Sequence, residues 1–466
     1  MRLRGGWIFA LALAACAPSV DQAVAPIAPA TLGLNGPETP VVADDWWRAL
    51  GDPQLDRLVA EALAGNPRLD AALARIRQAE AALATADAQL GPTVDLSGQA
   101  QEVRLSGRST IPPPFAGSTR FLGTVQANLN WNLDLFGRQR AAIEGARAST
   151  RAARLDLEAA RLALAGAVVQ TYAELARAER QAAIAERTVA TRAESLRLVQ
   201  VRIRNRLASE LEARGSETTL AQALAAVERA TRARRLALNA LAALIERGPE
   251  ATAGLGPTRL RLDAPLPLPA TLPADLLARR PDVAAALARI EAARASKEAA
   301  RLAYYPNINL LGLAGFTGVG IGNVLTPEAG TIGAGAALGL PIFDNGRRRA
   351  DLGRAAGVLD LAIADYNDEV VGAVREAADA ITRVSGLDAE RRRQAEVVRG
   401  FSETARLNNV RVASGLESKL GLVETDIRQL EAEQALANLA VDEALARVAL
   451  VLALGGGFAP VEEASR

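Results

Sequence analysis

The chain has 466 residues, a formal net charge of +1, no histidine, one cysteine and one methionine. Near-neutral charge gives no electrostatic reason for a nucleic-acid partner. The lack of histidine removes the commonest general base and a common ligand of transition metals. Aromatic residues make up only 3 %, a composition that suits long, closely packed helices better than a bulky interlocking core.

The N-terminus looks like a bacterial lipoprotein signal. Arg2 and Arg4 precede an apolar segment, residues 7–15, that is too short to span a bilayer and ends directly before Cys16. We expect residues 1–15 to be removed and the Cys16 thiol to carry the lipid, with palmitate as a further acyl chain. By the same resemblance, Ala17 favours sorting to the outer membrane. The alternative is an ordinary secretory signal with a chance cysteine.

The next segments read as an extended leader followed by two helices. Residues 16–45 are rich in proline, alanine and valine, which favours an extended chain. Asp52 and Pro53 then supply an N-cap and a first helical residue. A second helix is predicted from Pro67 to about Leu90.

A β-hairpin is predicted at about 93–135, where the apolar period changes from 3.6 to 2. One face is apolar and the other carries amides and hydroxyls, as expected of strands with lipid outside and water inside. The alternative is a half-buried sheet of a soluble sandwich. The apolar positions are Val94, Leu96, Gly98, Ala100, Phe121, Gly123, Val125, Ala127, Leu129, Trp131, Leu133 and Leu135.

Long helices are predicted after this hairpin. Residues 115–248 contain no proline, and 137–208 could form one helix of about 70 residues, or about 105 Å. Interspersed charges and helical apolar spacing favour lateral, coiled-coil-like packing. A plain helical rod is the alternative, but it does not explain the strands.

The second half of the chain repeats the first. Residues 66–76 return as 280–290 with an offset of 281 − 67 = 214, and 137–141 return as 346–350 with an offset of 349 − 140 = 209. A second, weaker hairpin is predicted at about 307–343, with alternation running to Ile342. We therefore predict a repeat at 46–248, a connector at 249–272, a second repeat at 273–456 and a tail at 457–466.

Four amphipathic strands cannot close a membrane barrel by themselves, because single-chain barrels need at least eight and open edges are not tolerated in lipid. Several chains must therefore share one barrel. Helices of about 100 Å exceed a hydrocarbon core of about 30 Å, so we expect them to project from the membrane as a tunnel.

Several motifs together resemble the outer membrane efflux protein family, the TolC-like channels, and within it the NodT-type lipoprotein subgroup. They are Trp46-Trp47 with Asp52-Pro53, Leu135-Phe136-Gly137-Arg138, Arg279-Arg280-Pro281-Asp282, Pro341-Ile342-Phe343-Asp344, and Leu454-Gly455-Gly456-Gly457. The resemblance implies an α+β membrane protein: a trimer with a twelve-stranded β-barrel, four strands from each chain, continued by a long α-helical barrel in the periplasm.

The resemblance also implies a function. The chain would be a passive exit duct for small molecules such as drugs, docked to a periplasmic adaptor and an inner-membrane RND-type transporter. The alternatives are a duct for type I protein secretion and a structural envelope lipoprotein that forms no channel. An enzyme is not expected, because the sequence offers no histidine, no cysteine beyond the signal and no Gly-rich phosphate loop after a strand. No cofactor or metal is expected.

In the family, two helix-to-helix turns form the far tip of the tunnel and meet the adaptor. Arg206 replaces the turn glycine of the first one, which puts that turn's geometry in question because arginine tolerates positive φ poorly. The alternative is that both are solvated turns without a partner. The corresponding residues are Arg206, Leu207, Ala208, Ser209, Glu212, Gly415, Leu416, Glu417 and Ser418.

The family's acidic pore constriction falls on Gly421 and Glu424, of which only Glu424 keeps a carboxylate, with Leu420 beside them. Three symmetry-related carboxylates would attract cations; the alternative is that these are ordinary exposed helix charges. We also expect ion pairs near the tips to latch the closed tunnel. The candidate groups are Arg202, Arg206, Arg411 and Lys419 with Glu210, Glu212, Glu417 and Glu424.

Overall fold

The computed structural model describes residues 23–28, 31–34, 36–37, 42–108, 112–264, 269 and 271–458. The predicted lipidation residue Cys16 lies outside these residues. The chain forms two compact units, and each draws on both halves of the sequence. One contains Arg75–Ala153 and Ala286–Tyr366, and the other contains Ile27–Ala74, Arg154–Ala285 and the chain from Asn367.

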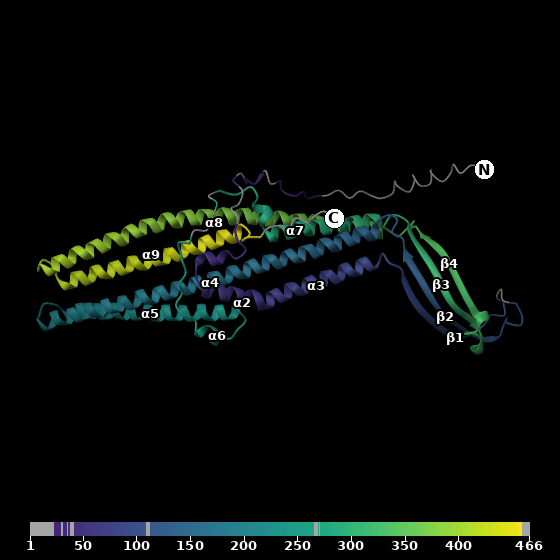
Figure 1. Cartoon of the computed structure of the whole chain (residues 1–466), viewed down its shortest axis with the longest axis horizontal. Helices are drawn as coiled ribbons and strands as arrows, with labels where there is room; N and C mark the ends of the chain where they lie inside the picture. The colour runs from purple at the N-terminus through teal and green to yellow at the C-terminus, as the bar shows by residue number, and fades with distance from the viewer. Residues whose placement is uncertain are drawn as a thin grey trace. The chain divides into compact units, whose positions relative to one another are not determined.

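The long helices come in pairs of equal length, which is the structural trace of the duplication (Figure 1). The long helix predicted over 137–208 is present as α4, with 67 residues. In the described residues, no helix is both long and apolar enough to cross a membrane. The pairs are α3 (Pro67–Ala88) with α7 (Pro281–Leu302), α4 (Arg138–Arg204) with α8 (Arg347–Ala413), and α5 (Glu210–Leu244) with α9 (Lys419–Ala453).

Short elements connect these helices. α2 begins as predicted, because the Asp52 side chain accepts a hydrogen bond from Gln54 N and Pro53 occupies the first helical position. The short elements are η2 (Trp46–Leu50), α2 (Pro53–Gly65), α6 (Glu250–Ala253), η3 (Leu276–Arg279), η4 (Ile321–Asn323) and η5 (Pro327–Ala329).

The four strands form one antiparallel sheet in the order β1-β2-β3-β4. The strand register places apolar residues of all four strands on one face of the sheet and the alternate residues on the other face. Leu96, Ala127, Ala314 and Ile332 lie in one row, and the adjacent row contains Ser97, Gln126, Gly315 and Thr331. The strands are β1 (Thr93–Arg104), β2 (Thr119–Asn132), β3 (Asn307–Val319) and β4 (Gly330–Gly339).

The predicted alternation runs past the true strand ends. It was carried to Leu135 and Ile342, but β2 ends at Asn132 and β4 at Gly339. In the first hairpin the reason is a capped turn: the Asp134 carboxylate accepts hydrogen bonds from the backbone N–H groups of residues 139 and 140 at the start of α4. The carboxylate of Asp344 does the same for residues 346 and 348 at the start of α8. The apolar residues continue, but the backbone has already turned into a helix.

Small side chains dominate the helix contacts. The core of the second unit includes Leu276, Ala377, Ala380 and Leu450. A core of the first unit joins Ile290 and Ala293 of α7 to Leu359 and Ile363 of α8. Alanine at such contacts lets helices approach closely, which explains how the protein packs with so few aromatic residues.

Candidate channel elements and the junction of the repeats

Two tips join the long helices: the first tip is residues 202–212, between α4 and α5, and the second is residues 411–421, between α8 and α9 (Figure 1). Their backbones close in the same way. Leu207 N donates to Arg202 O at 2.8 Å, and Leu416 N donates to Arg411 O at 2.8 Å. This six-residue closure is the Schellman pattern that ends many helices.

The turn geometry survives the replacement of glycine in the first tip. Arg206 has φ 60° and Gly415 has φ 71°, so both residues adopt the left-handed conformation. For arginine this conformation costs about 1–2 kcal/mol because Cβ crowds the following carbonyl. The neighbouring hydrogen bonds therefore hold Arg206 in a strained position.

Each tip is also stabilised by its own side chains. Ser209 and Glu212 form a complete capping box at the start of α5. In the second tip, the Ser418 side chain accepts a hydrogen bond from Gly421 N and so caps α9. Because residue 421 is glycine, the reciprocal side-chain bond of a capping box is not formed there. Of the predicted latch groups, Arg202 pairs with Glu212 at 3.2 Å, inside the same tip.

The second tip has the matching pair, Arg411 with Glu417 at 3.5 Å. Both pairs therefore stabilise a turn within one chain, and an interchain latch remains a prediction. Apolar side chains are nevertheless presented to solvent at both tips. Leu207 is 67 % exposed, Leu211 81 % and Leu416 71 %.

The predicted constriction residues lie on the first two turns of α9. Val423 and Ile427 are buried and fix which face of the helix packs inward. Leu420 and Gly421 are half-buried, and Glu424 is exposed. Asp426, which no sequence motif singles out, is half-buried on the same helix, and burial raises its pKa.

A buried polar cluster holds the start of α2 against α4. The Tyr172 hydroxyl donates to Asp52 Oδ2 at 2.7 Å, and Arg259 N donates to the same oxygen at 2.7 Å. Gln54 Nε2 donates to the Tyr172 hydroxyl at 2.9 Å. Burial and the Asp52 carboxylate together raise the pKa of Tyr172, so the phenol remains a hydrogen-bond donor.

The two repeats make one equivalent bond with different residues. Asn66 Nδ2 donates to the carbonyl of Leu244, the last residue of α5, at 3.1 Å. Arg280 donates to the carbonyl of Ala453, the last residue of α9, at 3.3 Å. The offsets, 280 − 66 = 214 and 453 − 244 = 209, are those of the sequence repeat. Helix C-termini leave carbonyls unpaired, and each repeat satisfies one of them from the residue that precedes its own first long helix, α3 or α7.

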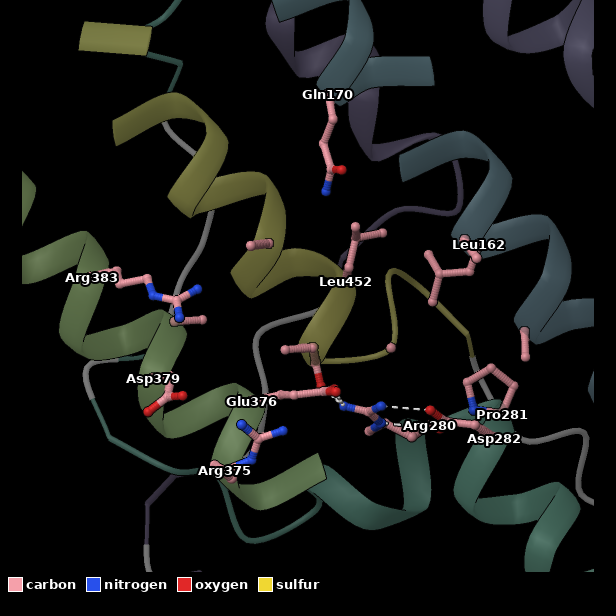
Figure 2. Close-up of a pocket in the computed structure, with 16 residues that line it drawn as sticks. Leu162, Gln170, Arg280, Pro281, Asp282, Arg375, Glu376, Asp379, Arg383 and Leu452 are labelled. Carbon is pink, nitrogen blue, oxygen red and sulfur yellow. Dashed lines mark hydrogen bonds and ion pairs between the residues drawn. The ribbon is translucent and has the colours of Figure 1, made fainter. Parts of the chain in front are cut away.

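Arg280 does more than its counterpart, because it also binds two carboxylates. It forms a two-pronged pair with Asp282 and donates to Glu376 at 2.9 Å (Figure 2). The cluster borders a cavity of about 380 Å³, whose other walls include Leu162 of α4 and Leu452 of α9. Arg280 thus joins α7, α8 and α9 at one point.

Two carboxyl groups near Arg280 have opposite pKa shifts. Burial opposes the charged form of Asp282, but hydrogen bonds and attraction from Arg280 outweigh burial and lower its pKa. Burial and a hydrogen bond with Asp282 raise the pKa of Glu369. Arg280 therefore favours the charged form of Asp282, whereas burial and Asp282 oppose ionisation of Glu369.

The paired repeats, the four-stranded sheet and the helical tips match a known family. The model of the outer membrane efflux protein family matches residues 58–246 and 272–456. The chain belongs to this family. The outer membrane protein OprJ of Pseudomonas aeruginosa is 30 % identical over 97 % of this chain and 95 % of its own length.

Two further relatives show the range of the likeness. The fusaric acid resistance protein FusA of Burkholderia cepacia is 34 % identical over 68 % of this chain, and the match spans 60 % of FusA. The crystal structure of the outer membrane protein VceC from Vibrio cholerae is similar with a TM-score of 0.81 and 28 % identity, covering 90 % of this chain and 100 % of VceC. The protein is thus an efflux protein of the outer membrane.

One feature of the sequence points to the role of Arg280. Arg280 stands where the repeat has Asn66, inside a motif that also supplies Asp282. A charged residue that replaces an amide at a repeated position indicates an added partner. The partner itself, Glu376, is 96 residues away and could not be identified from the sequence.

Proposed function

We propose that three copies of this chain form one outer-membrane exit duct of a tripartite efflux pump. The sheet supplies the main support. Its edge strands are β1 and β4 among the described residues, and its apolar face is open, with Leu96 78 % and Ile332 87 % exposed. Pairing β1 of one copy with β4 of the next would satisfy both edges and give twelve strands.

The duct is passive, and an inner-membrane RND-type transporter provides the energy through a periplasmic adaptor. The exposed leucines of the two tips support the adaptor contact, because apolar groups at otherwise polar turns are typical of a docking surface. One relative is named as a fusaric acid resistance protein and another as the outer membrane protein of a toluene efflux pump. We infer that small organic molecules are the transported class here as well.

Cys16 is the proposed lipid anchor of each copy. Acylation would tether the N-terminus, while the strands themselves cross the membrane. Replacing Cys16 with serine is expected to abolish palmitate labelling and to leave trimer formation intact. Labelling that persists in Cys16→Ser would rule out this site.

Glu424 is proposed as the acidic ring of the constriction. Its exposed position near the start of α9 leaves the carboxylate free to face the axis of a trimer. In bilayer recordings, Glu424→Gln is expected to lower cation selectivity. Glu431→Gln is the matched control, because Glu431 is also exposed on α9, two turns farther along. Equal loss in both variants would place the constriction elsewhere, with Leu420 as the next candidate.

The stoichiometry can be tested independently of transport. Native mass spectrometry of the detergent-extracted protein is expected to give three chains per particle. A stable single chain would contradict the proposed architecture.

A further inference from the structure

The connector between the repeats is fastened at both ends of residues 258–264. At the first end, Thr258 N and Oγ1 both donate to Glu179 Oε2 of α4, at 2.9 and 2.8 Å. At the other end, Arg447 of α9 donates to the carbonyl of Ala264 at 3.2 Å. The connector is therefore held against α4 and α9 as a strap.

A cavity of about 450 Å³ lies at this strap and has a basic lining. Arginines from three different segments line it: Arg180 from α4, Arg261 from the strap and Arg391 from α8. Its acidic residues are Asp263 and Glu443, so the lining has a formal charge of 3 − 2 = +1. The Glu443 carboxylate pairs with Arg391 and also with Arg447, so Arg180 and Arg261 remain in the lining with Asp263 as the other carboxylate.

Arg180 differs from its neighbours on α4 because its guanidinium has no counter-charge among the described residues. Along the same face of α4, Arg177 pairs with Asp442 at 2.6 Å and Arg187 pairs with Glu433 at 2.7 Å. Arg180 has no hydrogen-bond or ion-pair partner among the described residues, and burial lowers its pKa. A half-buried guanidinium without a counter-charge is costly.

The duplication allows Arg180 to be compared with the equivalent position of the second repeat. The position equivalent to Arg180 in the second repeat is Ala389, since 389 − 180 = 209. Ala389 is exposed, so the second repeat places neither a charge nor a large side chain at this position. The half-buried arginine is therefore specific to the first repeat.

We propose that this cavity binds a phosphate group between Arg180, Arg261 and Arg391. Guanidinium groups match the geometry of phosphate oxygens and are the usual choice for such sites. A bound phosphate would satisfy Arg180 and join the strap to α4 and α8. The volume exceeds that of a bare phosphate ion, so the group can be free or part of a small phosphomonoester.

The test is a calorimetric titration of the full-length protein in detergent. The two probes are inorganic phosphate and glycerol phosphate, and chloride at the same ionic strength is the reference. Wild-type protein is expected to bind at least one probe, and stronger binding of one identifies the source. Arg180→Gln is expected to weaken binding about 10-fold or more, as for loss of one charged hydrogen bond. Arg399→Gln, an exposed arginine of α8, is the matched control and should bind like wild type.

Two results would overturn the proposal: no binding of either probe by the wild type, or equal binding by Arg180→Gln and wild type. The first result is also what a trimer would give if a carboxylate of a neighbouring copy filled the cavity. If Arg180→Gln does not fold, Arg261→Gln tests the same contact from the strap, whose side chain is exposed. Since binding is measured without transport, the outcome is independent of the proposed pump function.

Discussion

Removing the Asp52 carboxylate should loosen the connector at Arg259. Asp52 is 3 % exposed, and its two oxygens accept three hydrogen bonds, from Gln54 N, Arg259 N and the Tyr172 hydroxyl. In Asp52→Ala, loss of the N-cap costs about 1 kcal/mol. Arg259 N and the Tyr172 hydroxyl also lose a charged acceptor. Each loss destabilises the fold by about 1.5 kcal/mol, the low end of the usual range.

The bonds from Gln54 N and Tyr172 join the helices, and only the bond from Arg259 N joins the connector to Asp52. Thr258 and Ala264 keep their own bonds to α4 and α9, so we take about 1.5 kcal/mol for the change in the local opening free energy of the connector. Because each 1.4 kcal/mol is a factor of ten, trypsin cleavage after Arg259 and Arg261 should accelerate about 10-fold, provided opening is fast relative to cleavage. The assay is limited proteolysis of the folded protein in detergent, followed by mass spectrometry of the fragments.

Two further variants separate the contributions. Asp52→Asn keeps the N-cap oxygen but places an amide N–H against the remaining donors, so a smaller acceleration is expected. Asp45→Ala is the control, because Asp45 makes no cap bond and only an exposed pair with Arg48. If Asp52→Ala is cleaved no faster than Asp45→Ala, the cluster does not hold the connector and the reasoning fails.

Three other substitutions test separate features. Arg206→Gly should relieve the left-handed strain of the first tip by about 0.5–1 kcal/mol after glycine's own entropic cost, seen as slower hydrogen exchange of the tip amides; faster exchange would contradict this. Burial raises the pKa of Asp426, so ionising this carboxyl lowers the free energy of unfolding. The loss of stability begins as pH rises through the pKa of the unfolded state and is complete above the pKa of the folded state. Asp426→Asn should therefore melt higher than wild type at pH 7 and equally near pH 3; a constant difference would exclude this titration. Gly455→Ala should lower the free energy of unfolding by more than about 3 kcal/mol. Gly455 has φ +92°, and a Cβ there would lie 1.9 Å from the Arg279 carbonyl oxygen. In the control Gly353→Ala, the added Cβ meets nothing within 4 Å, so this variant should melt no lower than wild type.

The periodic parts of the chain could be predicted from sequence because they depend on local patterns. Alternation identified the strands, and a long stretch without proline identified α4, a helix of 67 residues. The strand ends were placed too late because Leu133 and Ile342 keep the apolar period. The caps that end the pattern come from single aspartates, Asp134 and Asp344, which no periodicity reveals.

The junction of the repeats depends on contacts between distant residues. Asn66 reaches a carbonyl 178 residues away and Arg280 one that is 173 residues away. The repeat offset changes between donor and acceptor, so the equivalence of the two bonds is hidden in the sequence. The turn at Arg206 shows the opposite case: sequence preference argued against the geometry, and hydrogen bonding across the turn imposed it.

Single-channel recording of the purified protein in a planar lipid bilayer tests whether the assembled chains form a conducting duct. A shared duct predicts discrete conductance steps of uniform size that require the assembled trimer and favour cations. A protein that inserts as a trimer but gives no conductance, even at high voltage, would contradict the account and favour a structural envelope lipoprotein.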